Sequence, residues 1–139
     1  MNAVKDMMSI SSSTERVKTW LEGHVLHIRF NNPAKHNALS TDMWEAVPHL
    51  LEQAGHDDNV RMVVFSGEGQ KAFVSGADIS QFEDMRAMKE PVKRYEQLAE
   101  AALQGIYEFA KPTVACIRGY CIGGGVGVGG RAGPAGTGF

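Results

Sequence analysis

Residues Lys111–Gly127 read KPTVACIRGYCIGGGVG, and this stretch decides how the rest of the chain is organised. It predicts a short buried strand over Thr113–Ile117, a turn, and then a helix that begins in the glycine run Gly123–Gly125. Glycine disfavours helix interiors, but it lets a backbone approach another group closely and present bare N–H groups. The positive end of a helix dipole suits a developing negative charge. Tight packing of the helix against its neighbours is the alternative explanation.

A second glycine-rich loop, Gly67–Asp78, lies upstream of this stretch. It follows Val60–Ser66, whose apolar and β-branched residues are typical of a strand covered on both faces. A second glycine loop that follows a strand favours the interpretation of bare backbone N–H groups over tight packing alone.

Two helices are predicted between this second loop and the strand at Thr113. The shorter helix begins with Ser80 and Glu83, which have the spacing of a capping box. The longer helix has Pro91 as its first residue. Its apolar residues recur at intervals of three and four, which indicates one buried face: Val92, Tyr95, Ala99, Ala102, Ile106 and Phe109.

The N-terminal part predicts two alternating strands, Arg16–Leu21 and His24–Phe30, paired as a hairpin. With the later strands they indicate a parallel α/β arrangement, in which ligands bind outside the carboxyl ends of the strands. Three loops leave that edge: Asn31–Leu39, Gly67–Ser80 and Arg118–Gly125. We therefore expect the two glycine loops to converge, and two converging N–H groups can hold an oxyanion or an enolate.

A helix is also predicted between the first loop and the strand at Val60. Ser40 has the position of its N-cap, and Gly55 ends it after Ala54. Pro48 lies inside this span and implies a kink or a later start.

Composition limits the partners of the protein. The 139 residues suffice for one domain, and 14 Lys and Arg against 16 Asp and Glu give a formal net charge of −2. Without a basic block, nucleic acid and anionic membrane are not the expected partners. Cys116 and Cys121 have no matching Cys/His cluster, so neither a disulfide framework nor a metal site is predicted. Both are interpreted as small buried hydrophobic residues in a reducing, cytoplasmic compartment.

Three segments occur together in a characteristic order: FNNPAKHNALS (Phe30–Ser40), KAFVSGADIS (Lys71–Ser80) and KPTVACIRGYCIGGGVGV (Lys111–Val128). Jointly they closely resemble the crotonase superfamily, also called the enoyl-CoA hydratase/isomerase family, over about Arg16–Val128. The resemblance implies the N-terminal part of a ββα-repeat (spiral) α/β fold. It implies an acyl-CoA or enoyl-CoA substrate, with coenzyme A as part of the substrate and no separate cofactor. It also implies a parent protein that is a homotrimer or a dimer of trimers.

The same resemblance assigns site residues. It makes the backbone N–H groups of Ala77 and Gly124 the two donors of an oxyanion hole. Lys35 matches a position near the coenzyme A phosphates and adenine, and Phe73 and Ser75 border the thioester and adenine pocket. The remaining binding residues are Asp78, Ile79 and Gly123. Asp78 is expected to cap and fix its loop, and a role as an acid or base is the less favoured alternative.

The chain also departs from the family pattern. Hydratases of the family usually place a glutamate two residues after the third glycine, where this chain has Gly127. A second catalytic glutamate normally lies beyond the last residue of this sequence. The resemblance therefore implies acyl-CoA binding and enolate stabilisation, with hydration of a 2-enoyl-CoA as the expected reaction of an intact parent. Enoyl-CoA isomerisation and a truncated, non-catalytic fragment are the alternatives.

The two ends differ from the central part, residues 15–128. Residues 1–14 are polar and serine-rich without the pattern of a signal peptide, and they are expected to form a mobile tail. Gly129–Phe139, GGRAGPAGTGF, does not resemble the family continuation. Its glycine content predicts disorder rather than a helix, and it suggests a shortened product of a longer gene.

Other glycine-rich sites fit less well. A dinucleotide fingerprint follows its strand directly, whereas Arg118–Ile122 separates strand and glycines here. A P-loop requires Gly-Lys-Ser/Thr after the glycines, and that triplet is absent from the sequence. The Gly-x-Ser-x-Gly motif of serine hydrolases is not met at Ser75, which has a glycine on one side only.

Overall fold

Six strands form two sheets in the part of the chain that the computed structural model describes, residues 10–82 and 89–132. The larger sheet has the order β1-β2-β3-β5, and the smaller sheet pairs β4 with β6. The strands are β1 (Val17–Glu22), β2 (Val25–Phe30), β3 (Met62–Gly67), β4 (Ala72–Val74), β5 (Thr113–Ala115) and β6 (Tyr120–Cys121). Strands β1 and β2 are antiparallel, as the predicted hairpin requires, and β2, β3 and β5 are parallel.

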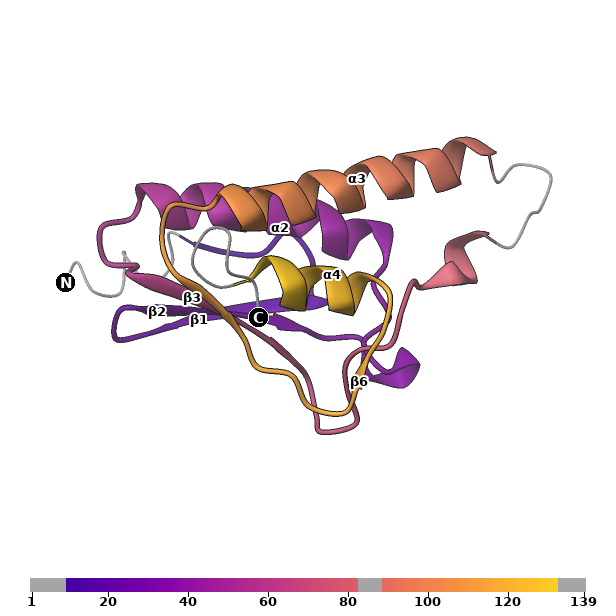
Figure 1. The fold of residues 1–139 in the computed structure, drawn as a ribbon, viewed down its shortest axis with the longest axis horizontal. Coiled ribbons are helices and arrows are strands. Elements are labelled where there is room, and N and C mark those ends of the chain that lie inside the picture. The colour runs from indigo at the N-terminus through magenta and orange to yellow at the C-terminus, as the bar shows by residue number, and fades with distance from the viewer. Residues whose placement is uncertain (1–9, 83–88, 133–139) are drawn as a thin grey trace.

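Helices α2 and α3 run side by side on one face of the larger sheet (Figure 1). The helices are η1 (Pro33–Lys35), α2 (Thr41–His56), η2 (Ile79–Phe82), α3 (Lys89–Glu108) and α4 (Gly124–Arg131). In β2, Leu26, Ile28 and Phe30 are buried in the core that contains α2, whereas His27 and Arg29 alternate onto the other face. The two faces of the larger sheet therefore have different chemistry.

The chain repeats one unit, in which a strand of the larger sheet is followed by a strand of the smaller sheet and then by a helix. The first such unit is β3-β4-α3 and the second is β5-β6-α4. Both strand pairs that relate the two units, β3 with β5 and β4 with β6, are parallel. This repetition places the loop after β4 beside the loop after β6.

The core lies between the larger sheet and the helices and is closed by large buried side chains. Fully burying a side chain of this size stabilises the fold by about 1.5–3 kcal/mol relative to leaving it exposed. The largest buried side chains are Trp44, Phe30, Phe65, Phe73, Leu26, Ile28, Leu39, Met43, Leu50 and Ile106.

Helix α2 begins at Thr41 after Ser40, as predicted, but it continues through Pro48 and past Gly55 to His56. A late start is thus excluded. A proline inside a helix costs about 3 kcal/mol or more. Residues on both sides of Pro48, among them Val47 and Leu50, are completely buried, and this packing offsets that cost.

Other boundaries need correction. The expected strand Thr113–Ile117 ends at Ala115, and Ile117 is exposed. Strand β3 is buried mainly on one face, because no helix covers its other face in the described part of the chain. Helix α3 begins at Lys89, two residues before Pro91. Cys116 is exposed and Cys121 half-buried, so the interpretation of both as buried residues is wrong for Cys116.

The ends of the described region differ from the tails that the sequence indicated. Helix α4 extends to Arg131, and Gly129 is buried, so the expectation that no helix forms from Gly129 onward needs correction. Near the N-terminus, the Thr14 hydroxyl donates to Asp42 in α2 at 2.7 Å. The predicted capping residue Glu83 lies outside the described residues. Within the described chain, no helix has the length and apolar character needed to cross a membrane.

Candidate active site

Three loops meet beyond the strand ends of the larger sheet. Leu39 forms a parallel bridge with Ala77: its N–H donates to the Gly76 carbonyl at 2.8 Å, and its carbonyl accepts from the Asp78 N–H at 2.9 Å. On the other side of this segment, the Ile122 N–H donates to the Val74 carbonyl at 2.9 Å. The predicted convergence of the loops is confirmed by these hydrogen bonds.

The N–H groups of Ala77 and Gly124 are both left without an acceptor among the described residues. For Ala77 this follows from the bridge, because Leu39 bonds to the residues on either side of it. For Gly124 it follows from the position at the first turn of α4, where helical N–H groups have no intrahelical partner. The two segments are adjacent, since a Cβ on Gly123 would lie 3.7 Å from the Gly76 Cα.

The glycines at the start of α4 are required by close packing. A Cβ on Gly124 would lie 2.5 Å from Trp44 Cζ2 and 3.1 Å from Leu39 Cδ1. A Cβ on Gly125 would lie 2.7 Å from the Val74 Cβ. Both explanations that the sequence left open therefore apply to this run: the glycines pack tightly, and the same approach brings the α4 N-terminus beside Ala77.

Asp78 fixes the loop that carries Ala77. Its carboxylate is buried and accepts from Lys35 Nζ at 3.1 Å, from Asn32 Nδ2 at 3.2 Å and from the Ser80 N–H at 3.1 Å and hydroxyl at 2.6 Å. Burial by itself raises the pKa of this carboxyl, but the hydrogen bonds from Ser80, Lys35 and Asn32 outweigh it and lower the pKa to about 2. These contacts are those of a capping residue at the start of η2.

We expect the free energy of unfolding to fall when Asp78 is protonated. A carboxyl with a depressed pKa stabilises the fold above its unfolded-state value of 3.8, and that contribution disappears as the pH falls through about 2. The shift corresponds to about 2 kcal/mol. Urea denaturation between pH 5 and pH 2 should therefore show a shallower pH dependence for Asp78→Asn than for the wild type. Asp58→Asn, at an exposed carboxyl, is the control, and an equal loss of slope in both variants would contradict the assignment.

The other expected binding residues divide into two groups. Ser75 lies with Lys35, because its hydroxyl donates to the Lys35 carbonyl at 3.0 Å. Ile79 projects into solvent beside them with 71% of its surface exposed. Phe73 does not join them: it is buried with its ring edge against Phe30, at 5.7 Å between centroids.

Two residues important for the loop arrangement were missed by sequence reasoning. Asn37 is buried in a left-handed conformation, and its amide bonds to the Asn32 N–H and to the carbonyls of Glu68 and Ala72. The Tyr95 hydroxyl donates to the Leu39 carbonyl at 2.8 Å, which ties α3 to the bridge with Ala77. An asparagine in a turn-rich loop is a weak signal for such a role, and Tyr95 has the spacing of an ordinary core residue.

Two carboxylates of the loop Gly67–Asp78 are already engaged in ion pairs. Asp78 binds Lys35, and Glu68 binds Lys18 at 2.9 Å. Glu83 and Asp84, two further acidic residues downstream of Asp78, lie outside the described residues. At Gly127, a Cβ would lie 3.0 Å from Leu103 Cδ1, so this position faces α3.

The chain is similar to a set of enzymes that act on coenzyme A thioesters. Residues 25–133 match the family model described as enoyl-CoA hydratase/isomerase. A short-chain-enoyl-CoA hydratase of Clostridium acetobutylicum is 30% identical over 104 residues, which cover 75% of this chain and 39% of that protein. A peroxisomal Delta(3,5)-Delta(2,4)-dienoyl-CoA isomerase of Arabidopsis thaliana is 30% identical over 129 residues, which cover 86% of this chain and 46% of that protein.

Solved structures agree with the sequence relatives. An enoyl-CoA hydratase/carnithine racemase of Magnetospirillum magneticum superposes with a TM-score of 0.78 at 31% identity, over 87% of this chain and 45% of that one. The chain spans less than half the length of each of these three proteins.

Proposed function

Because this chain belongs to the enoyl-CoA hydratase/isomerase family and has the N-terminal part of the crotonase fold, we propose that it binds acyl-CoA thioesters. In this proposal the thioester oxygen lies between the N–H groups of Ala77 and Gly124. The observation that carries it is that these two N–H groups lie on adjacent segments and donate to no other described residue. Two preorganised donors of this kind stabilise the negative charge that develops on a thioester oxygen when an enolate forms.

The nucleotide end of the ligand is assigned to Lys35 and its neighbours. The Lys35 ammonium is 44% exposed although it is paired with Asp78, so it can meet a phosphate without leaving its loop. Ser75, Ile79 and Gly123 border the path from Lys35 to the two N–H groups in this proposal, and Phe73 supports the loop from the core. Coenzyme A is part of the substrate here, and we propose no separate cofactor.

The reaction that we propose for a longer parent protein is hydration of a 2-enoyl-CoA. The hydroxyl of a water molecule bonds to C3 while a carboxylate takes the water's other proton, and a proton is then delivered to C2. The negative charge that develops on the thioester oxygen between these events is stabilised by the N–H groups of Ala77 and Gly124. Activating the water and delivering the proton require a carboxyl group, which Gly127 cannot supply. Isomerisation of an enoyl-CoA is the second candidate, because a dienoyl-CoA isomerase is among the similar proteins. A fragment that binds thioesters without turnover is the third.

Partners and compartment follow from the same reasoning. We propose that the parent is a homotrimer or a dimer of trimers that acts in the cytoplasm on free acyl-CoA. The support for this assembly is the family itself, and the support for the compartment is the presence of only two cysteines, Cys116 and Cys121.

The binding proposal is tested by removing one donor. Replacement of Ala77 by lactic acid exchanges its N–H for an ester oxygen and keeps the methyl side chain. We expect the wild type to bind acetyl-CoA more tightly than S-ethyl-CoA, which lacks the thioester oxygen. In the variant, the ratio of the S-ethyl-CoA Kd to the acetyl-CoA Kd should fall about tenfold, which corresponds to the loss of one hydrogen bond. Isothermal titration calorimetry with both ligands separates this effect from a general distortion of the site, because such a distortion would weaken the binding of both ligands equally. An unchanged preference would refute the role of Ala77.

The reaction is tested with crotonyl-CoA. Hydration is followed by loss of enoyl absorbance, with sedimentation of the same sample to establish its oligomeric state. Turnover by a folded oligomer would support the hydratase proposal and require an acid in residues 83–88 or in a neighbouring protomer. Acetyl-CoA binding without turnover would support the non-catalytic alternative.

A further inference from the structure

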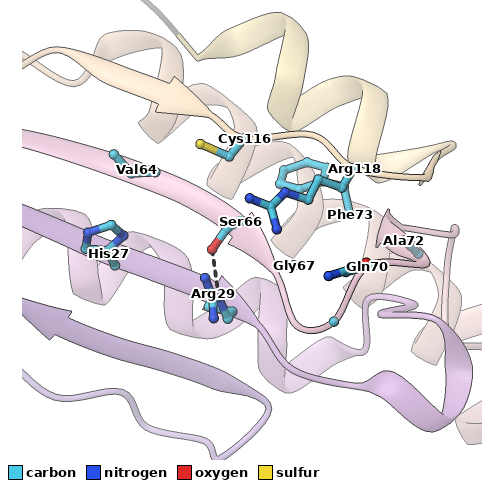
Figure 2. Close-up of a pocket in the computed structure, with 11 residues that line it drawn as sticks. His27, Arg29, Val64, Ser66, Gly67, Gln70, Ala72, Phe73, Cys116 and Arg118 are labelled. Carbon is cyan, nitrogen blue, oxygen red and sulfur yellow. Dashed lines mark hydrogen bonds between the residues drawn. The ribbon is translucent and has the colours of Figure 1, made fainter.

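A cavity of about 410 Å³ lies on the face of the larger sheet that α2 and α3 do not cover (Figure 2). It is bounded by the outer side chains of β2 and β3 and by the loops that follow β3 and β5. Its lining residues are His27, Arg29, Val64, Ser66, Gly67, Gly69, Gln70, Ala72, Phe73, Cys116 and Arg118. Lys35, Ala77 and Gly124 are not among them, so this cavity is separate from the proposed thioester site.

Two guanidinium groups enter the cavity from different segments. Arg29 is held in place because its Nε donates to the Ser66 hydroxyl at 3.0 Å and its guanidinium lies 4.8 Å from the centre of the Trp20 ring. Its terminal N–H groups form no hydrogen bond or ion pair with another described residue. Arg118 comes from the loop after β5, and its guanidinium is turned toward Ser66 (Figure 2). No described residue forms an ion pair with Arg118.

Two carboxylates lie near the cavity but do not line it. Glu68 lies near Arg29 but binds Lys18 at 2.9 Å, and Glu22 binds His27 at 3.1 Å. Neither acidic side chain lines the cavity. The cavity thus contains two guanidinium groups, a serine hydroxyl and a glutamine amide, without an acidic group of its own.

We propose that this cavity binds a small organic anion with two oxyanion groups, each held by one arginine. Arginine forms paired hydrogen bonds to carboxylate and phosphate oxygens, so two guanidinium groups match two such groups. The volume falls within the range of small-molecule sites. The Ser66 hydroxyl, which accepts from Arg29 Nε, lies between the two arginines and can donate its own hydrogen bond to the ligand. Val64 and Phe73 form the apolar side of the cavity and face the carbon skeleton of the ligand. The inference stands independently of the proposed acyl-CoA site.

The test is calorimetric titration with pyrophosphate and, separately, with citrate at constant ionic strength. We expect saturable one-to-one binding of at least one probe, and the comparison decides between phosphate and carboxylate groups. Arg118→Gln should weaken this binding about tenfold or more, because it removes one guanidinium group with its paired N–H donors and breaks no hydrogen bond or ion pair with a described residue. Arg118→Lys keeps the positive charge but lacks the paired N–H donors of a guanidinium group. It should weaken the binding measurably, but less than Arg118→Gln does.

Arg61→Gln is the matched control, since Arg61 is an exposed arginine next to the opposite end of β3 and does not line the cavity. An equal loss of binding in Arg61→Gln and Arg118→Gln would mean general charge attraction and would overturn the proposal. So would the absence of saturable binding, or displacement of the probe by acetyl-CoA. Acetyl-CoA affinity should be unchanged in Arg118→Gln, which distinguishes failure at this cavity from failure of the thioester site.

Discussion

Asn37→Ala is expected to lower the free energy of unfolding by about 3 kcal/mol or more. The side-chain amide accepts from the Asn32 N–H at 2.9 Å and donates to the carbonyls of Glu68 at 3.0 Å and Ala72 at 2.8 Å. Each hydrogen bond contributes about 1 kcal/mol, and a buried group left without a partner costs about 1–3 kcal/mol. Alanine is also less tolerant than asparagine of the left-handed backbone at this position, where φ is 60°.

The measurement is urea denaturation of Asn37→Ala beside Asn59→Ala. Asn59 is exposed, and its side chain makes no hydrogen bond to a described residue, so its replacement deletes the same amide at little cost. Asn37→Asp adds a second comparison, because an ionised carboxylate keeps the acceptor for Asn32 but cannot donate to the two carbonyls. A loss below about 1 kcal/mol for Asn37→Ala would show that this amide does not hold the loops together.

Gly119→Ala is expected to be at least as damaging, because the obstacle is backbone. A Cβ at Gly119 would penetrate the Lys71 carbonyl group and lie 3.1 Å from the Ala72 nitrogen. The adjacent Tyr120 N–H donates to that same Lys71 carbonyl at 3.0 Å, so relief of the clash would break the hydrogen bond that joins β6 to the residue before β4. We expect a loss of about 3 kcal/mol or more, with weaker acetyl-CoA binding, since β6 leads into Gly124.

Gly69→Ala is the control for Gly119→Ala. Both glycines have a positive φ, 78° at Gly69 and 69° at Gly119, so both substitutions carry the same left-handed strain of about 1–2 kcal/mol. A Cβ at Gly69 meets no heavy atom within 4 Å. The difference between the two variants in thermal or urea unfolding therefore measures the clash alone. Equal destabilisation would mean that the Lys71 carbonyl moves aside freely and that β4–β6 pairing is not rigid.

Both substitutions act on the positioning of the proposed donors rather than on the donors themselves. Asn37 ties the first loop to Glu68 and to Ala72, the first residue of β4, and Gly119 lets β6 pair with β4. Ala77 and Gly124 lie directly downstream of β4 and β6 in the chain. A thioester site made of backbone N–H groups has no reactive side chain to retain, so its geometry depends on these internal contacts.

The sequence alone was sufficient for features that depend on local pattern. The alternation in His24–Phe30 predicted β2 and its buried face, and Ser40 identified the start of α2, because period and capping are properties of neighbouring residues. The three motifs also predicted the family, and the order of the parallel strands predicted the convergence of the loops around Ala77 and Gly124. Strands β4 and β6 were not predicted, because they lie within the segments interpreted as loops, Gly67–Ser80 and Arg118–Gly125. Parallel strands bring their carboxyl-end loops to one edge, which makes such convergence predictable.

Tertiary structure decided what depends on contacts between distant segments. Helix α4 continues through Gly129 because that residue is buried in the fold, and α2 continues through Pro48 because packing compensates for a lost hydrogen bond. The roles of Asn37 and the exposure of Cys116 also follow from neighbours far away in the chain. The presence of Arg29 and Arg118 in one cavity has the same origin. In the sequence 88 residues lie between them, and the parallel register of β2, β3 and β5 brings them to the same cavity.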